Sequence, residues 1–425
     1  MTRRRLLAIS YFFPPLAGGG VHRVLSFARH LPARGWDVTV VCAGEDDYWV
    51  RDPSLLARVP AETEVIRVPG GSALASWLRL GGGKGRRRGG TFAGLRRLSD
   101  WWLLPDSYAG WAHRAREAAA RRLAGGGVDA LLTTSPPDSV HLAGPDLARR
   151  FRVPWVADFR DPWIALRFRE PPTAWHRARH EAMERRVLGG ADLVLAASRT
   201  HRDEIAAAGA ARRAEHLPNG FEPDPPAAPA GADPDHFRLA FTGTLSLMED
   251  AGTLLEAVHD VLARHGEARR RLRADLAGPY DLDYEDRALA LGLKGIVRFA
   301  GPVSHDESRA LQRAADALLL WKPRGAGYRT MVPGKLYEYL DAGRPVIAML
   351  PERDEAADLV RRAGGVVLPP GDRAGLAREL ETRYMAWKER GRAPDGRPAW
   401  LDEHARPNLA GRLAGLLDGL TGGRA

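Results

Sequence analysis

The most constraining feature of this sequence is a strand–helix–strand pattern in its first 45 residues. Residues 5–11 form a short apolar run, Gly18–Gly20 interrupt the chain, and apolar residues in 21–31 recur at helical spacing. Gly35 ends the predicted helix, and residues 36–42 form a second apolar run. A strand, a crossover helix and a second strand are typical of a parallel sheet, so the chain is expected to fold as an α/β protein.

The same alternation recurs along the chain and predicts two domains. Further strand-like runs lie at 129–133, 153–158, 193–197, 237–241, 272–277, 297–299, 317–321, 345–349 and 365–368. Proline, glycine and asparagine cluster between the two sets, which indicates a linker. We expect an N-terminal Rossmann-like domain at 1–215, a linker at 216–234, a second Rossmann-like domain at 235–396 and C-terminal helices at 397–425, with packing of those helices on the first domain left open. Doubly wound sheets bind ligands at the carboxyl ends of their strands.

Composition excludes several classes of protein. Charged residues make up 27% of the chain, and no stretch of about 18 apolar residues lacks a charge, so a membrane-spanning helix is not expected. Cys42 is the only cysteine, which excludes an internal disulfide and fits a reducing, cytoplasmic location. The first apolar run is short and ends at Pro14-Pro15, so it is interpreted as a buried strand rather than a signal peptide.

The formal net charge of +10 is concentrated in one segment. Seven of the basic residues lie between Arg79 and Leu98 without an acid among them, and the rest of the chain carries only +3. Tryptophans and leucines flank this segment. Basic residues beside tryptophan suit an anionic bilayer, so we expect residues 77–104 to contact the inner face of the membrane; a solvated loop beside buried tryptophans is the alternative. No nucleic-acid-binding module accompanies the charge, and no nucleic acid partner is expected.

Two local patterns suit a phosphorylated ligand. Gly18–Gly20 between a strand and a helix can bind an anion through free amides, although the loop is neither GxGxxG nor a P-loop, and a tight turn without a ligand is an equal alternative. Downstream, Pro333 and Gly343 delimit a short helix on which Lys335 and Glu338 share a face. The helix start and Lys335 can hold phosphate oxygens, and Glu338 can accept hydrogen bonds from ribose hydroxyls. A solvated Lys–Glu pair is the alternative.

With these residues in view, the chain resembles the family 4 retaining glycosyltransferases of GT-B architecture, in a subgroup that has Pro-x-Lys-x-x-Glu-Tyr in place of the full Glu-x7-Glu motif. The resemblance follows family order over nearly the whole chain, in residues 11–20, 34–41, 217–220, 241–245, 297–303 and 338–346. It implies two Rossmann-like domains facing a central cleft. It also implies metal-independent transfer of a sugar, with retention, from a nucleotide-sugar co-substrate to a glycan or lipid-linked acceptor. No separate cofactor is implied, and the setting would be cell-surface polysaccharide or glycolipid synthesis.

The resemblance also implies site residues. Gly19 and Gly20 would lie against the donor diphosphate or the acceptor, Gly301 near the nucleotide base, and Glu338 at the ribose. Arg160 and Asp161 end a strand close to the transferred sugar, where Asp161 would orient a hydroxyl; an ion pair with Arg160 or a helix cap is the alternative for Asp161.

Departures from the family pattern concern the diphosphate. Thr330 occupies the position of the first glutamate, and Arg160 that of a histidine. Gly243 keeps the glycine of a Gly-Arg-Leu-x3-Lys pattern whose cations are replaced by Thr244 and Glu249. Because a diphosphate leaving group needs positive charge, we expect it from Lys335, Arg160, Arg329 and the helix that begins near Gly334.

Three further alternatives follow from the same residues. Asp281 and Asp283 resemble a metal-binding triplet, but acidic residues are common at helix starts and no metal is expected. The lost cations leave open a non-catalytic nucleotide-sugar-binding protein of the same fold. A nucleotide-sugar epimerase or hydrolase is a third alternative, and it would not need the basic tryptophan segment.

Overall fold

The structure is a computed structural model that describes residues 3–47, 51–70, 101–164, 171–223, 233–245, 251–280, 283–322, 326–394 and 396–422. The chain divides into two compact units. The divisions fall between Glu222 and Pro223 and between Asp402 and Glu403, so the last residues of the chain belong to the first unit. These divisions lie later than the 215 and 396 expected from sequence, because residues 214–216 pair with the first sheet and Phe221 pairs with Ala405.

The first unit is built on a seven-stranded parallel sheet in the order β3-β2-β1-β4-β5-β6-β7. Its strands are β1 Arg4–Ser10, β2 Trp36–Ala43, β3 Glu64–Val68, β4 Ala130–Ser135, β5 Trp155–Phe159, β6 Leu193–Ala196 and β7 Ala214–His216. Its α-helices are α1 Val21–His30, α4 Ala109–Ala124, α5 Gly144–Phe151, α6 Ala174–Gly190, α7 Arg199–Ala207 and α15 Arg406–Thr421. Short 3-10 helices lie at Pro32–Arg34, Pro53–Arg58 and Asp138–Ala143.

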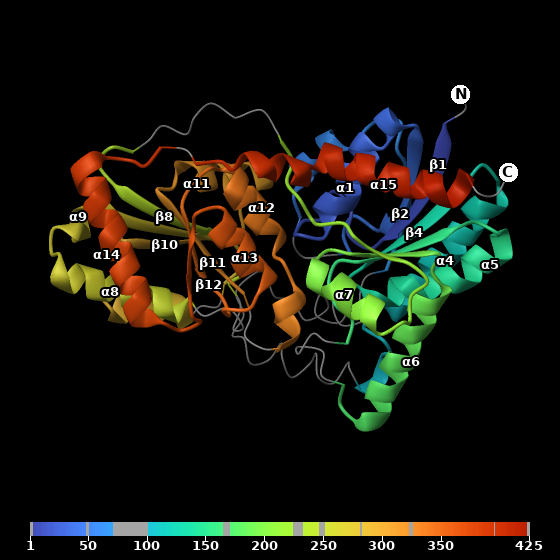
Figure 1. Ribbon diagram of the computed structural model, residues 1–425, viewed down its shortest axis with the longest axis horizontal. Coiled ribbons are helices and arrows are strands. Elements are labelled where there is room, and N and C mark those ends of the chain that lie inside the picture. Colours follow the sequence, from blue (N-terminus) through green and yellow to red (C-terminus); the bar gives the residue numbers. More distant parts are fainter. Residues whose placement is uncertain are drawn as a thin grey trace. The chain divides into compact units, whose positions relative to one another are not determined.

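Helix α15, the last helix of the chain, completes the core of the first unit. It lies beside α1 (Figure 1) and buries Leu409, Leu413 and Leu417 in the same cluster as the strands of the first sheet. Trp36 Nε1 of β2 donates to Asp418 Oδ1 at 2.8 Å, which fixes the end of the helix. The sequence predicted C-terminal helices at 397–425; the structure has a 3-10 turn at Ala399–His404 followed by α15.

The second unit is built on a six-stranded parallel sheet in the order β10-β9-β8-β11-β12-β13. Its strands are β8 Phe237–Thr242, β9 Leu272–Ala277, β10 Val297–Gly301, β11 Ala317–Trp321, β12 Val346–Met349 and β13 Val366–Leu368. Its helices are α8 Gly252–Arg264, α9 Ala268–Arg271, α10 Asp283–Ala290, α11 His305–Ala314, α12 Gly334–Asp341, α13 Glu355–Arg362 and α14 Arg373–Arg390, with a 3-10 turn at Ala326–Thr330. Helices α8 and α14 cover one face of this sheet and α11 to α13 the other (Figure 1).

Both sheets are doubly wound, so the predicted α/β fold is confirmed. In each sheet the strand order reverses beside the first strand of the unit, next to β1 in one and β8 in the other. Loops at the carboxyl ends of strands on either side of such a reversal diverge and leave room for a ligand. No helix in the described part of the chain is long and apolar enough to span a bilayer.

Candidate functional site

Three glycines lie side by side at the carboxyl ends of neighbouring strands in the second unit. Gly243, Gly278 and Gly301 have φ values of 139°, 133° and 69°, which favour glycine. Gly243 N donates to Ala277 O at 2.8 Å, and Gly278 N donates to Gly301 O at 2.7 Å. A Cβ on Gly278 would collide with the Gly243 carbonyl, whereas the space beside Gly301 is open. The bare backbone therefore gives a ligand close access to this edge of the sheet.

Lys335 extends from the first turn of α12 toward these glycines. Its Nζ lies 3.8 Å from the centroid of the Phe241 ring and 2.8 Å from the position that a Cβ on Gly243 would take. Phe241 in turn stacks on Trp321, with ring centroids 4.3 Å apart. The face of the Phe241 ring attracts the ammonium and holds it in place. The positive charge of Lys335 therefore lies at the end of β8.

Glu338, one turn further along α12, is 8% exposed and oriented by α11. His305 Nε2 lies 3.1 Å from Glu338 Oε1. Gln312 Nε2 lies 3.4 Å from Glu338 Oε2 and also donates to Thr242 Oγ1 at 3.0 Å. The Gln312 amide therefore joins Glu338 to the carboxyl end of β8. His305 and Gln312 cannot be assigned to this site from the sequence, because only the fold brings α11 and α12 together.

A buried ion pair anchors the segment that leads into α12. Lys322, directly after β11, has its Nζ 2.5 Å from Asp354 Oδ2, and it donates to Met331 O at 2.8 Å. Burial lowers the pKa of Lys322 and raises the pKa of Asp354, and each charge opposes the shift of the other. The pair fixes Met331, three residues before α12, and so helps to position the helix that carries Lys335 and Glu338. This pair, too, cannot be found from the sequence, because β11 and the residues before α13 come together only in the fold.

Arg160 is the central side chain at the strand ends of the first unit. It follows β5 and is 7% exposed. Its Nε donates to Ser135 O at 2.5 Å and its Nη2 to Pro136 O at 3.2 Å. Its Nη1 lies 3.0 Å from the position that a Cβ on Gly20 would take. Burial lowers the pKa of Arg160, while Asp161 and Asp158 oppose that shift.

Asp158, within β5, forms a separate buried ion pair. It accepts two hydrogen bonds from Arg23, at 2.8 and 2.7 Å, and one from Thr134 Oγ1 at 2.8 Å. Arg23 also donates to the carbonyls of Leu217 and Pro218, at 2.9 and 2.8 Å. This pair joins α1 to β5 and to the segment that leaves the first unit. The neighbouring Asp161 has its pKa raised by burial, with Arg160 opposing the shift.

The remaining predicted residues are placed as follows. Thr244 and Arg329 are exposed, Thr330 is buried, Gly334 begins α12, and Gly19 faces open space. Asp283 begins α10. Glu249, Asp281 and residues 77–100 of the predicted membrane segment lie outside the described residues. Within the described ranges no three His, Cys, Asp or Glu side chains lie close enough to hold a metal ion.

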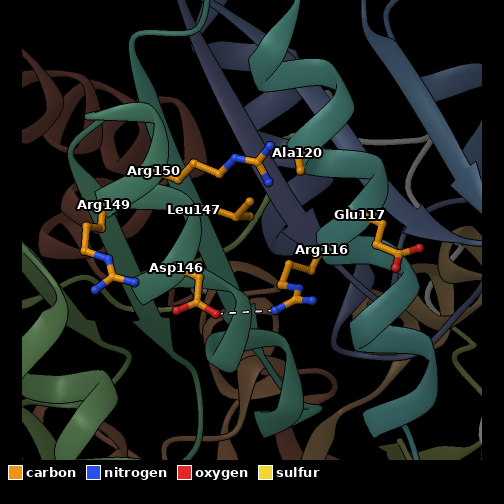
Figure 2. Close-up of a pocket in the computed structure, with 7 residues that line it drawn as sticks. All are labelled: Arg116, Glu117, Ala120, Asp146, Leu147, Arg149 and Arg150. Carbon is orange, nitrogen blue, oxygen red and sulfur yellow. Dashed lines mark hydrogen bonds and ion pairs between the residues drawn. The ribbon is translucent and has the colours of Figure 1, made fainter.

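A separate pocket of about 440 Å³ lies between α4 and α5 of the first unit (Figure 2). Arg116 and Asp146 pair across it at 3.3 Å, and Arg186 also reaches Asp146 at 3.2 Å. Its charges include both signs, and it is lined by helix residues rather than by the loops that follow strands. We assign no ligand to it.

Gly278 could have been found from the sequence as part of the candidate site. Its Gly-Pro sequence after an apolar run repeats that of Gly301.

The sequence matches two families of protein domain. Residues 18–220 match the glycosyl transferase 4-like domain, and residues 236–384 match the glycosyl transferases group 1 domain. The chain carries both domains of a GT-B glycosyltransferase. The finer assignment to a motif subgroup stays a prediction. No curated protein matches the sequence.

Solved structures share the fold over the whole chain at low identity. Alr3699/HepE of Anabaena, in complex with UDP-glucose, is 15% identical, with a TM-score of 0.63 over 98% of this chain and 99% of that one. Sucrose-phosphate synthase of Thermosynechococcus elongatus is 17% identical, with a TM-score of 0.65 over 99% and 100%. A trehalose 6-phosphate synthase of Burkholderia multivorans is 14% identical, with a TM-score of 0.68 over 100% of both chains. At these identities the likeness establishes the fold of the glycosyltransferase.

Proposed function

We propose that this protein transfers a sugar, with retention and without a metal, from a nucleotide-sugar donor to a glycan or lipid-linked acceptor. The proposed setting is the synthesis of a cell-surface polysaccharide or glycolipid. One observation carries the donor assignment. The ammonium of Lys335 lies at the glycine-lined end of β8, and Gln312 links the buried carboxylate of Glu338 to Thr242 at that same end. The two glycosyltransferase domains support the reaction class.

The proposed donor site assigns one part of the nucleotide sugar to each group. The diphosphate lies against the backbone of Gly243 and Gly278, where Lys335 and the N-terminal amides of α12 supply positive charge to the leaving group. The ribose hydroxyls donate to Glu338, whose carboxylate His305 and Gln312 hold in place. Open space at Gly301 leaves room for the base. The solved Alr3699/HepE structure contains UDP-glucose, which supports a nucleotide sugar as the class of donor.

The donor assignment is tested by thermal stability with UDP-, GDP- and ADP-sugars. A ligand that binds only the folded state increases the free energy of unfolding, by about 2.7 kcal/mol at a hundredfold excess over its Kd. The melting temperature rises as a result. We expect one nucleotide to stabilise the wild type and to lose this effect in Glu338→Ala and Lys335→Met. Glu389→Ala, an exposed glutamate on α14, serves as the matched control and should behave as wild type.

The outcomes separate the alternatives. Stabilisation by none of the nucleotides would overturn the donor site and favour a protein without catalysis. Stabilisation that survives Glu338→Ala would place the nucleotide elsewhere. Release of free sugar or an epimer from the donor, with no acceptor present, would favour a hydrolase or epimerase over a transferase.

We also propose that the first unit contacts an anionic membrane from the cytoplasmic side. Trp101, Trp102 and Trp175 are 52%, 84% and 60% exposed. Trp101 and Trp175 both stand edge-on to His176, with ring centroids 5.6 and 4.9 Å away, so they form one aromatic patch. Tryptophan is favoured at the membrane–water interface, and the seven basic residues of 79–97 adjoin Trp101 in the sequence.

Vesicles with graded anionic lipid test the membrane contact. We expect binding to rise with anionic lipid and to fall by on the order of 100-fold when Arg86, Arg87 and Arg88 are changed to glutamine, since each basic residue contributes about 1 kcal/mol. Trp102→Ala with Trp175→Ala should weaken binding at every lipid composition. Leu289→Ala removes an equally exposed apolar side chain from the second unit and is the control. Equal binding by all four proteins would refute the contact.

A further inference from the structure

A hollow of about 580 Å³ lies at the amino ends of β8, β9 and β10 in the second unit. The first residue of each strand is apolar and belongs to the core cluster shared with α8 and α14. The second residue therefore points to the opposite face of the sheet, and in all three strands it is an arginine: Arg238, Arg273 and Arg298. A parallel sheet usually has apolar residues on both faces, so three arginines beside a hollow are a departure that needs a reason.

Two of the three arginines share one buried carboxylate. Asp275 of β9 is 7% exposed. Arg298 Nε donates to Asp275 Oδ1 at 2.6 Å, and Arg238 Nη1 lies 3.9 Å from Asp275 Oδ2. Asp233, ahead of β8, also accepts from Arg238 Nη2 at 2.8 Å. These two acids balance the charges of Arg238 and Arg298 and fix where their guanidinium groups lie.

Arg273 adds a positive charge that no acid in the described ranges balances. Its Nη1 donates to the main-chain carbonyls of Leu272 at 2.7 Å and Arg269 at 3.4 Å, and it forms no ion pair within those ranges. The register places Arg273 directly beside Arg238 on the neighbouring strand. Like charges at paired positions of a sheet repel each other and destabilise the sheet. An anion bound between the two guanidinium groups would remove that repulsion.

The size of the hollow and the spacing of its cations favour a small molecule with several negative groups. Neighbouring strands lie about 4.8 Å apart, and residues two positions apart on one strand are separated by about 6.6 Å. By the register, Arg273 is therefore about 5 Å from Arg238 and about 8 Å from Arg298 at the backbone. A volume of about 580 Å³ lies in the range of small-molecule sites. A guanidinium binds carboxylate and phosphate groups alike, through two parallel hydrogen bonds.

We propose that the amino ends of β8, β9 and β10 form a binding site for a small polyanion that carries carboxylate or phosphate groups. The site is separate from the candidate donor site, where the same three strands lead into Gly243, Gly278 and Gly301. Gly278 follows Arg273 by five residues, about 16 Å along the strand. The polyanion site does not depend on the proposed function, because none of its residues contacts Lys335 or Glu338 in the described part of the chain.

Isothermal titration calorimetry of the full-length protein with citrate and with pyrophosphate, at one fixed ionic strength, tests the site. We expect the wild type to bind at least one of them, and Arg273→Gln to weaken that binding at least about tenfold, as loss of a charged hydrogen-bond donor does. Arg378→Gln, an exposed arginine on α14, is the matched control and should bind as wild type. Tighter binding of citrate identifies the ligand class as a polycarboxylate, and tighter binding of pyrophosphate identifies it as a phosphate ester.

Melting temperatures separate a lost site from a lost fold. Without an anion, Arg273→Gln should melt at or above the temperature of the wild type, because the repulsion from Arg238 is gone. With the anion, the wild type should gain stability and Arg273→Gln should not. An Arg273→Gln protein that melts below the wild type without an anion would show that Arg273 is a structural contact, and the site would be refuted.

Three other results would also overturn the site. The first is that the wild type binds neither anion, or that Arg273→Gln binds as well as the wild type. The second is binding that Lys335→Met abolishes and Arg273→Gln keeps, which places the anion in the candidate donor site. The third is displacement of the anion by a short duplex DNA that Arg273→Gln no longer binds, which makes the hollow part of a nucleic-acid surface.

Discussion

At the scale of single residues, the second unit depends on charges that have no access to water. Lys322 and Asp354 are each almost fully buried, and their contact is also the anchor for the Met331 carbonyl. A buried pair of this kind contributes little net stability compared with an apolar pair, but breaking it leaves one charge unpaired. The Lys322–Asp354 pair instead serves to position the segment before α12.

Lys322→Met should therefore lower the free energy of unfolding of the second unit by about 3–5 kcal/mol, because Asp354 then lies buried without a counterion. Urea unfolding followed at both units by hydrogen exchange measures the change. Adding Asp354→Leu should recover part of the loss. Lys388→Met, which removes an exposed ion pair with Glu267, should change the free energy of unfolding far less, because solvent screens that pair. A Lys322→Met protein as stable as Lys388→Met would contradict the assigned role.

At the scale of elements, α6 uses one face to hold the segment around Asp161. His176, His180 and Glu184 recur every four residues and so share that face. His176 Nε2 lies 3.3 Å from Trp101 O, Trp163 Nε1 donates to His180 Nδ1 at 3.0 Å, and the backbone of Ile164 donates to Glu184. One helix thus connects the tryptophan patch to the residues that follow β5.

Glu184 gives this face a pH dependence. Burial raises its pKa from 4.5 to about 7, so the folded state holds the proton more tightly than the unfolded state. Its favourable contribution is complete below pH 4.5 and is lost as the pH rises through 7. Glu184→Gln should therefore gain stability relative to wild type between pH 5 and pH 8, by on the order of 1–3 kcal/mol.

Urea unfolding of both proteins at the two pH values measures this gain. Glu389→Gln, an exposed glutamate on α14 in the second unit, should show no such gain. A stability difference between wild type and Glu184→Gln that stays constant with pH would show that the carboxyl titrates normally.

At the scale of the whole molecule, the sequence predicts every strand of the second sheet and the central strands of the first, but neither edge strand of the first sheet. Central strands such as β8 are buried apolar runs, and each lies where the sequence placed it. The edge strands β3 and β7 were not predicted, because their residues are half exposed and lack an apolar run. These two strands are specified by their pairing with β2 and β6, which a local pattern does not contain.

The candidate site follows the same division. Lys335 and Glu338 are three residues apart on one helix and can be found from their spacing, and so can the glycines that interrupt apolar runs. Gln312 and Lys322 are far from them in sequence, and only the folded sheet brings Gln312 to Glu338 and Lys322 to Asp354. The residues next to Gln312 and Lys322 in the sequence do not distinguish them from ordinary polar side chains. Partners that orient a site thus need the three-dimensional structure.

The return of α15 to the first unit sets an order of assembly. Its leucines fill a core whose strands are synthesised before the whole second unit, whereas α15 itself leaves the ribosome after it. While the second unit is being made, α1 and β2 therefore have an uncovered apolar surface. The core of the first unit, whose strands leave the ribosome first, is therefore completed last. A chaperone that covers α1 during translation would protect its apolar surface until α15 has been made.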